Sequence, residues 1–121
     1  MRLLKFLVFA VIILVNSCIT SFESIANNII LSTVSDSLKI DNLIGEKIYY
    51  FAVESNFAAA LNWAPSKNGP FIKKGHYKKI SFNEISNGKP EPAYKGDRII
   101  VYWWTDALHD YNDVFYNVIV L

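Results

Sequence analysis

The sequence predicts a small all-β fold: an immunoglobulin-like antiparallel β-sandwich of about six or seven strands, preceded by a signal peptide helix. Short runs of β-branched and aromatic residues recur along the chain, and such runs have a high strand preference. All five glycines and all four prolines lie between Gly45 and Gly96, where they separate these runs with turns. No convincing amphipathic helical repeat accompanies them. About 100 residues follow the signal, which is enough for one small domain.

The expected strands can be placed in order through the middle of the chain. The alternating run 37–41 and the aromatic run 47–54 flank the turn-forming segment 42–46, and this pattern predicts a hairpin. Residues 71–82 predict a strand, a turn at Gly75 and a second strand. Within segment 56–65, Ala58 to Leu61 could form one helical turn or a short strand before Pro65. Turn-rich or polar loops are expected at 66–70, 83–97 and 106–113.

The C-terminal part contains the two strongest strand runs, RIIVYWWT at 98–105 and VFYNVIVL at 114–121. The polar loop between them predicts that they pair as an antiparallel hairpin. Both faces of each run are largely apolar. We therefore expect both strands to be central in a sheet rather than at its edge.

The N-terminal residues 1–17 have the pattern of a secretion signal. Arg2 and Lys5 precede ten apolar residues at 6–15, and polar residues follow at once. A membrane-spanning helix needs about 20 apolar residues, so this run is short for a span but usual for a signal peptide. A buried core helix is the disfavoured alternative, because the run lacks polar positions at helical spacing.

Cys18 is the single cysteine, and it follows the apolar run directly. The sequence Val15-Asn16-Ser17-Cys18 resembles a bacterial lipobox, in which the cysteine is lipidated and becomes the first residue; Asn16 departs from the usual small residue. A lone cysteine in an exported chain cannot form an internal disulfide. The alternatives are ordinary signal cleavage near Ser17 or Thr20, which would give a secreted soluble protein, or a free thiol without a role.

The domain boundaries follow from this interpretation. We expect a signal peptide at 1–17, a tether at 18–35 and the β-sandwich domain at 36–121, although Ile29 to Val34 could already form an edge strand. Cleavage before Cys18 removes two of the twelve basic residues and leaves eleven acidic ones, for a net charge of −1. This balance does not indicate nucleic acid or an anionic membrane surface as a partner. Membrane attachment is expected through the N-terminal lipid.

Aromatic side chains provide the candidate binding surface. Alternation along the strand 98–105 places Trp103 on one face and Trp104 on the other, so one of them is expected in the core. An exposed aromatic patch on the other face would suit a sugar ring or a partner protein. The alternative is that these aromatics fill a small core and cover its outer sheet. The candidate surface consists of Tyr50, Trp63, Tyr102 and Trp104.

Three further groups are weaker candidates. The loop 106–113 contains Asp106, His109, Asp110 and Asp113, which could bind a cation, but their spacing matches no calcium loop and a solvated loop is favoured. His76 lies among four lysines, as a basic patch for a phosphate or anionic glycan or as a solvated hairpin. Glu54 lies on an aromatic strand, where half burial would raise its pKa, but the sequence offers it no acid or base partner. No common catalytic motif is present.

Several short segments occur together in an order that resembles a group of known proteins. The segments are IYYFAVE at 48–54, NWAP at 62–65, IKKG at 72–75, ISFNEI at 80–85 and IIVYWW at 99–104. Together they resemble short secreted or lipid-anchored bacterial proteins of uncharacterised function, over most of residues 37–121. The resemblance implies a small exported β domain, and it implies no catalytic residue, cofactor or substrate.

The sequence therefore predicts an exported, lipid-anchored protein of the cell envelope that acts as a binding or interaction module. Its expected partner is an envelope protein or a glycan, and we expect neither an enzyme nor a cofactor. The alternative is a secreted carbohydrate-binding module in which Trp63 or Trp104 stacks on a sugar. A hydrolase is the third and least favoured hypothesis.

Overall fold

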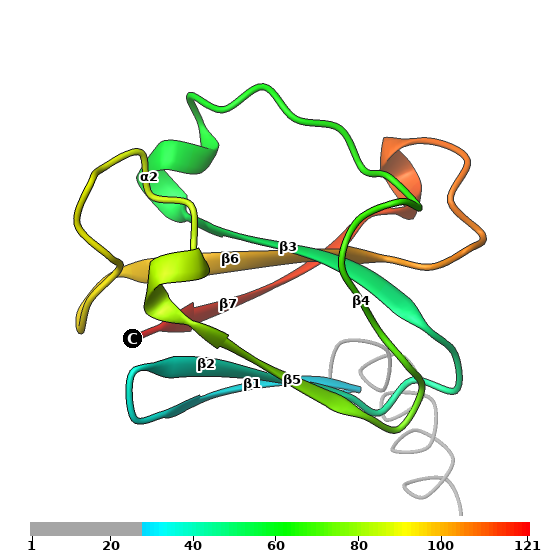
Figure 1. Cartoon of the computed structure of the whole chain (residues 1–121). Coiled ribbons are helices and arrows are strands. Elements are labelled where there is room, and N and C mark those ends of the chain that lie inside the picture. Colours follow the sequence, from blue (N-terminus) through cyan, green and yellow to red (C-terminus); the bar gives the residue numbers. More distant parts are fainter. Residues whose placement is uncertain (1–27) are drawn as a thin grey trace, which may run out of the picture.

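The structure is a computed structural model that describes residues 28–121, and it confirms the all-β sandwich (Figure 1). This part of the chain forms seven strands in two antiparallel sheets. The three-stranded sheet has the order β1 (Ile29–Val34), β2 (Ser37–Asn42), β5 (Tyr77–Ser81). The four-stranded sheet has the order β4 (Phe71–Ile72), β3 (Ile48–Glu54), β6 (Arg98–Trp104), β7 (Phe115–Val120). The expected signal peptide and Cys18 lie outside the described residues.

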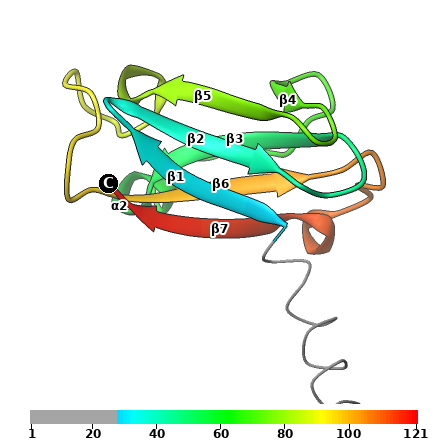
Figure 2. The ribbon, with the colours of Figure 1, turned by 90° about the horizontal axis from the view of Figure 1, so that it is seen from below.

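The strand order is close to that of immunoglobulin domains. In the constant-type immunoglobulin sandwich the fourth strand pairs with the fifth. Here the fourth strand, β4, pairs with the third strand, β3, in the opposite sheet. Figure 2 shows that the N-terminal end of β1 approaches β7 at one margin of the sandwich, where Asn117 Nδ2 donates to the Ile29 carbonyl at 3.3 Å. The other margin lies between β5 and the β3–β4 pair.

The predicted hairpin between 37–41 and 47–54 is wrong. β2 pairs with β1 and β5, whereas β3 belongs to the opposite sheet. The inward side chains explain the difference, because Leu38 and Ile40 on β2 are fully buried in the core that the two sheets share. Local pairing of the two runs would leave these side chains without a facing sheet. The turn at Gly75 is present, with φ of 74°, but the strands that flank it also lie in different sheets.

The predicted C-terminal hairpin is confirmed. β6 pairs with β7 in antiparallel register, with Trp103 opposite Phe115. β6 is central, as expected, but β7 is an edge strand, and its outward Val118 and Val120 are 38% and 63% exposed. An apolar pattern on both faces of a run therefore does not show whether the strand is central in its sheet or lies at the edge.

The connections contain short helical turns. A helical turn, α2, spans Ser55–Ala58, so it lies earlier than the predicted Ala58–Leu61 and shares only Ala58 with it. 3₁₀ turns occur at η1 (Phe82–Glu84) and η2 (Tyr111–Asp113). The sandwich also includes β1, which the boundary at residue 36 assigned to the tether, so the alternative of an edge strand at Ile29–Val34 describes the structure better. Within residues 28–121, no helix has the length and apolar character that crossing a bilayer requires.

A buried asparagine joins the two sheets at one end of the core. Asn42, the last residue of β2, is fully buried. Its Nδ2 donates to the carbonyls of Glu46 at 2.9 Å, Ile72 at 3.0 Å and Lys73 at 3.3 Å, and its Oδ1 accepts from the Ile44 amide at 3.0 Å. Since Ile72 ends β4, this side chain ties the three-stranded sheet to the four-stranded one. A buried polar group is tolerated because its hydrogen bonds are satisfied.

Replacement of Asn42 tests this junction. We expect Asn42→Ala to lower the free energy of unfolding by about 2–4 kcal/mol, because it leaves buried carbonyls without donors and creates a cavity. Urea denaturation followed by tryptophan fluorescence measures the change. The exposed Asn56 in α2 provides the control, and Asn56→Ala should cost less than about 0.5 kcal/mol. Equal losses in the two variants would contradict a structural role for the Asn42 side chain.

Candidate functional site

The two neighbouring tryptophans of β6 lie on opposite faces of the sheet, as the alternation predicts. Trp103 is the core residue, and it is 2% exposed. Its Nε1 donates to Asn117 Oδ1 at 2.8 Å, and its ring stacks on Phe115 with centroids 4.6 Å apart. Trp104 therefore lies on the outer face of the four-stranded sheet.

The outer face of that sheet carries a cluster of aromatic rings. The Trp63 ring lies 4.9 Å from the Tyr102 ring and 5.9 Å from the Trp104 ring, measured between centroids. Phe51 contacts Trp63 edge-on at 5.1 Å, and Tyr49 stacks on Trp104 at 6.4 Å. The structure thus brings together three of the four residues of the predicted binding surface.

This aromatic cluster is covered rather than exposed. Figure 1 shows that the segment from α2 to β4 runs over the outer face of β3 and β6. Trp104 is only 3% exposed, and its Nε1 donates to the Ser66 carbonyl in this segment at 3.0 Å. At the same end, Tyr49 Oη donates to Asp106 Oδ1 at 2.8 Å and Lys67 Nζ donates to the Asp106 carbonyl at 2.7 Å. The cluster therefore forms a second small core beneath a loop.

Tyr50 lies on the opposite face of β3 from the other three residues. The register pairs Tyr50 with Trp103, so the two side chains share the inner face of the sheet. Tyr50 is 6% exposed and belongs to the core. The run KIYYFAVE is apolar on both faces, and sequence alone could not assign Tyr49 and Tyr50 to their sides.

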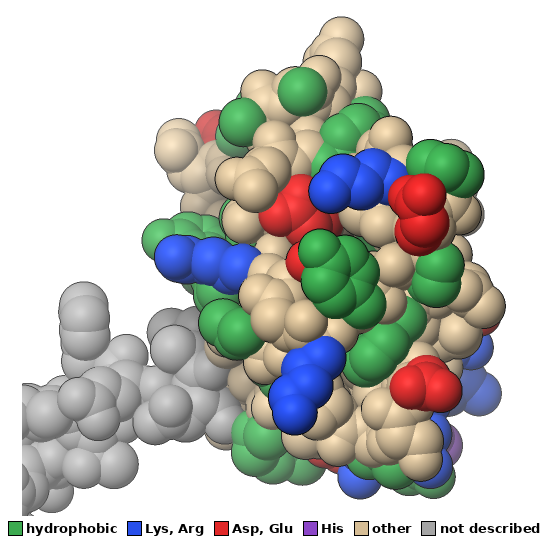
Figure 3. Space-filling view, turned by 90° about the vertical axis from the view of Figure 1, so that its left-hand side faces the viewer, with side chains coloured by type: hydrophobic (Ala, Val, Ile, Leu, Met, Phe, Trp, Pro, Cys, Tyr) green, Lys and Arg blue, Asp and Glu red, His purple; other side chains and the backbone are tan. Residues whose placement is uncertain are grey.

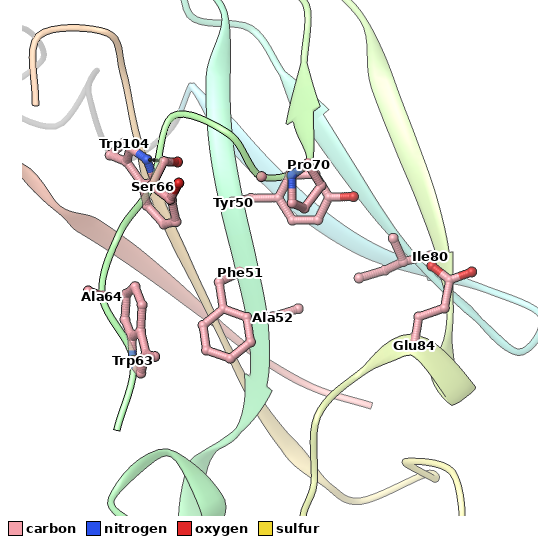
Figure 4. Close-up of a pocket in the computed structure, with 11 residues that line it drawn as sticks. Tyr50, Phe51, Ala52, Trp63, Ala64, Ser66, Pro70, Ile80, Glu84 and Trp104 are labelled. Carbon is pink, nitrogen blue, oxygen red and sulfur yellow. Dashed lines mark hydrogen bonds between the residues drawn. The ribbon is translucent and has the colours of Figure 1, made fainter. Parts of the chain in front are cut away.

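Residues from both faces of β3 nevertheless line one pocket, which lies at the edge of this strand. It has a volume of about 370 Å³ and lies between the segment 63–70 on one side and β5 with η1 on the other (Figure 4). This volume falls in the range of small-ligand sites, which are mostly apolar with a few polar groups. The pocket is lined by Tyr50, Phe51, Ala52, Trp63, Ala64, Ser66, Gly69, Pro70, Ile80, Glu84 and Trp104.

The pocket exists because β3 lacks a continuous neighbour on this side. β4 pairs only with Ile48 and Tyr49. Beyond them the Tyr50 amide donates to the Pro70 carbonyl at 3.3 Å, and the Glu54 amide donates to the Ser86 carbonyl at 2.8 Å. Alternate amides of a strand point the same way, so the Ala52 amide also points to this margin. In the described chain no strand pairs with β3 between these two hydrogen bonds.

Two polar groups give the pocket its chemical character. Burial raises the pKa of Tyr50, and the negative charge of Glu84 raises it further, so the phenol is a protonated donor at neutral pH. The Glu84 carboxylate lies at the exposed rim and can accept hydrogen bonds from a ligand. The remaining lining is mainly aromatic and aliphatic. The arrangement suits a ligand with an apolar face and a few hydrogen-bonding groups.

The acidic loop before β7 is organised by its own backbone. Asp110 caps η2 by accepting from the Asn112 amide at 2.8 Å. Asp113 accepts from the amides of His109 at 2.8 Å and Asp110 at 3.3 Å, and these bonds hold the pKa of Asp113 below its ordinary value. Within residues 28–121, no group of three acidic, histidine or cysteine side chains is placed to hold a metal ion.

The expectation that Glu54 has a raised pKa is wrong. Its carboxylate accepts from the amides of Asn56 and Phe57, both at 3.0 Å, and so caps α2. These hydrogen bonds, that from Asn56 foremost, lower the pKa of Glu54 because they favour the charged form. The residue thus has a structural role at a helix start, which the short sequence SNFA after it did not reveal.

No protein-family model, curated protein sequence or solved structure matches this chain. The geometry of the pocket is therefore the basis for a functional proposal.

Proposed function

We propose that this chain is an exported, lipid-anchored protein of the bacterial cell envelope whose sandwich binds a ligand in the pocket beside β3. The observation that carries the proposal is the pocket itself, an aromatic-walled cavity at the stretch of β3 whose edge on the β4 side has no paired strand. Its expected ligand belongs to an envelope protein or a glycan. Export and anchoring rest on the apolar run 6–15 and on Cys18, which precede the described residues.

The lining of the pocket favours binding over catalysis. Hydrolysis of a glycoside or ester needs paired acid and base groups or an activated nucleophile. Among the described residues that line the pocket, Glu84 is the single carboxylate, and it lies at the rim. Glu54, the catalytic candidate from sequence, instead caps α2. These placements support a binding module, and they make the hydrolase hypothesis less favoured.

The covered aromatic cluster favours a concave site over a flat one. A broad aromatic platform would require Trp104 at the surface, whereas its ring is buried and hydrogen-bonded to Ser66 in the segment 59–70. Trp63 is half-buried and forms one wall of the pocket, so its ring can contact a bound group. This position also supports the alternative, a secreted carbohydrate-binding module, because an aromatic wall beside hydrogen-bonding groups suits a sugar ring.

Substitution of Cys18 tests the anchoring. The chain expressed in a bacterial host should fractionate with membranes and carry the added mass of a diacylglyceryl group, and Cys18→Ser should lose both because it lacks the thiol. Membrane fractionation and intact mass are the measurements. If both forms are soluble and cut near Ser17 or Thr20, the anchoring is refuted and the secreted alternative is favoured.

A residue introduced into the pocket tests the binding site. The position of the Cβ at Gly69 has open space, so Gly69→Leu should fold and fill part of the pocket. In a Cys18→Ser background, which removes the anchor, we expect it to reduce co-sedimentation with bacterial cell envelopes from which the lipids have been extracted by about tenfold or more. Gly45 in the β2–β3 loop has equally open space outside the pocket, and Gly45→Leu is the matched control. Equal binding by the two variants would show that this pocket is not the binding site.

A further inference from the structure

The outer face of the three-stranded sheet is open, in contrast to the covered face of the other sheet. Figure 1 shows no segment of the described chain beneath β1, β2 and β5. The strand register places Ile30, Asp41 and Tyr77 in one row across this face, and Ser32, Lys39 and Lys79 in the next. Ile30 is 45% exposed and Tyr77 is 56% exposed. The face thus presents apolar and basic side chains together.

Lysines are concentrated along this face and its adjoining turn. Residues 71–83 contain four lysines and no acidic residue, although the chain without its signal has a net charge near −1. The ammonium groups of Lys39 and Lys79 lie 4.6 and 6.0 Å from the centre of the Tyr77 ring. We call the set Lys39, Lys73, Lys74, Tyr77 and Lys79 the basic face, whereas Lys78 pairs with the buried Ile40 and lies on the other side of β5.

At the end of the sandwich that contains the turn at Gly75, most acidic groups lie in loops of the four-stranded sheet. On the basic face itself Asp41 lies 3.8 Å from Lys39, and it offsets that one charge. Glu46 lies in the loop to β3, and Asp106, Asp110 and Asp113 belong to the β6–β7 loop of the four-stranded sheet. The opposite end of the sandwich, shown in Figure 3, has basic and acidic side chains interspersed. Positive charge is therefore concentrated at the basic face in a way that the net charge does not reveal.

The basic face lies beside the point where the chain from Cys18 enters the sandwich. The Asn28 carbonyl accepts from the Leu43 amide at 2.8 Å, and the neighbouring Asn42 amide donates to the His76 carbonyl at 2.9 Å. The segment between Cys18 and Asn28 spans at most about 35 Å when fully extended. An anchor at Cys18 would therefore hold this end of the domain close to a bilayer. Leu43, 54% exposed, adds an apolar side chain at the same point.

We propose that the basic face is a membrane-contact surface that rests on the headgroups of anionic phospholipids. Lysines near a membrane surface are attracted by its negative potential, and tyrosine is favoured at the level of the headgroups. The contact would orient the three-stranded sheet toward the bilayer. The proposal takes its geometry from the anchor at Cys18, but the surface can be tested without lipidation.

Vesicle binding by the Cys18→Ser chain provides the test. Co-sedimentation is compared between vesicles of phosphatidylcholine alone and vesicles that also contain phosphatidylglycerol. We expect binding to the anionic vesicles to be stronger and to weaken with salt. The triple variant Lys73→Gln, Lys74→Gln, Lys79→Gln should reduce the partition coefficient on anionic vesicles by roughly 10- to 100-fold. Any contribution of residues 6–15 is the same in all variants.

A matched triple variant controls for net charge. Lys89→Gln, Lys95→Gln, Arg98→Gln removes the same number of charges from exposed positions away from the basic face, and it should leave binding to anionic vesicles within about twofold of the starting chain. Equal losses in the two triple variants would overturn the proposal, as would equal binding to neutral and anionic vesicles. Retention on heparin without binding to phosphatidylglycerol vesicles would assign the face to a soluble polyanion and refute the lipid assignment. None of these outcomes depends on the pocket beside β3.

Discussion

The buried side chain of Asn42 fixes the path of the chain between the two sheets. By donating to the Ile72 and Lys73 carbonyls, it holds the end of β4 against the end of β2. The chain therefore leaves the four-stranded sheet after a strand of two residues and turns at Gly75 into β5. Because β4 is short, Phe51 and Ala52 pair with β6 on one side only, and the unpaired side opens the pocket. The same turn places Lys73 and Lys74 beside the entry of the chain. Both proposed surfaces thus depend on one satisfied polar group in an apolar core.

The two sheets use their outer faces differently. The four-stranded sheet carries its aromatic cluster beneath the segment 59–70, where burial of large rings stabilises the loop that forms one wall of the pocket. The three-stranded sheet carries no such cover, and its exposed side chains are basic and apolar together. Apolar surface that remains exposed on one face, beside concentrated positive charge, is consistent with a surface that meets an anionic bilayer. The pocket opens at the margin between β5 and β3, so a bound ligand and a bilayer can be accommodated at different places.

Composition and alternation predicted the strands, the C-terminal hairpin and the opposite placement of Trp103 and Trp104, because these depend on local preference and on the period of two. The sheet assignment of β2 and β3 could not be predicted, since it depends on which faces meet across the core. The pocket also escaped prediction, because it results from hydrogen bonds of Pro70 and Ser86 to distant positions on β3. Net charge concealed the basic face, because the lysines of 71–83 are balanced by acidic residues elsewhere in the chain. The pKa of Glu54 was predicted in the wrong direction, because the carboxylate caps a helical turn whose backbone could not be predicted.

Amide hydrogen exchange measured by NMR tests most directly whether β3 has an open stretch that faces the pocket. The amides of Tyr50 and Glu54 donate to the Pro70 and Ser86 carbonyls, whereas the Ala52 amide between them faces the pocket. We predict that the Ala52 amide exchanges on the order of a hundred times faster than the Glu54 amide in the free protein. Equal protection of the three amides would show that another segment covers this stretch of β3, and it would contradict the account.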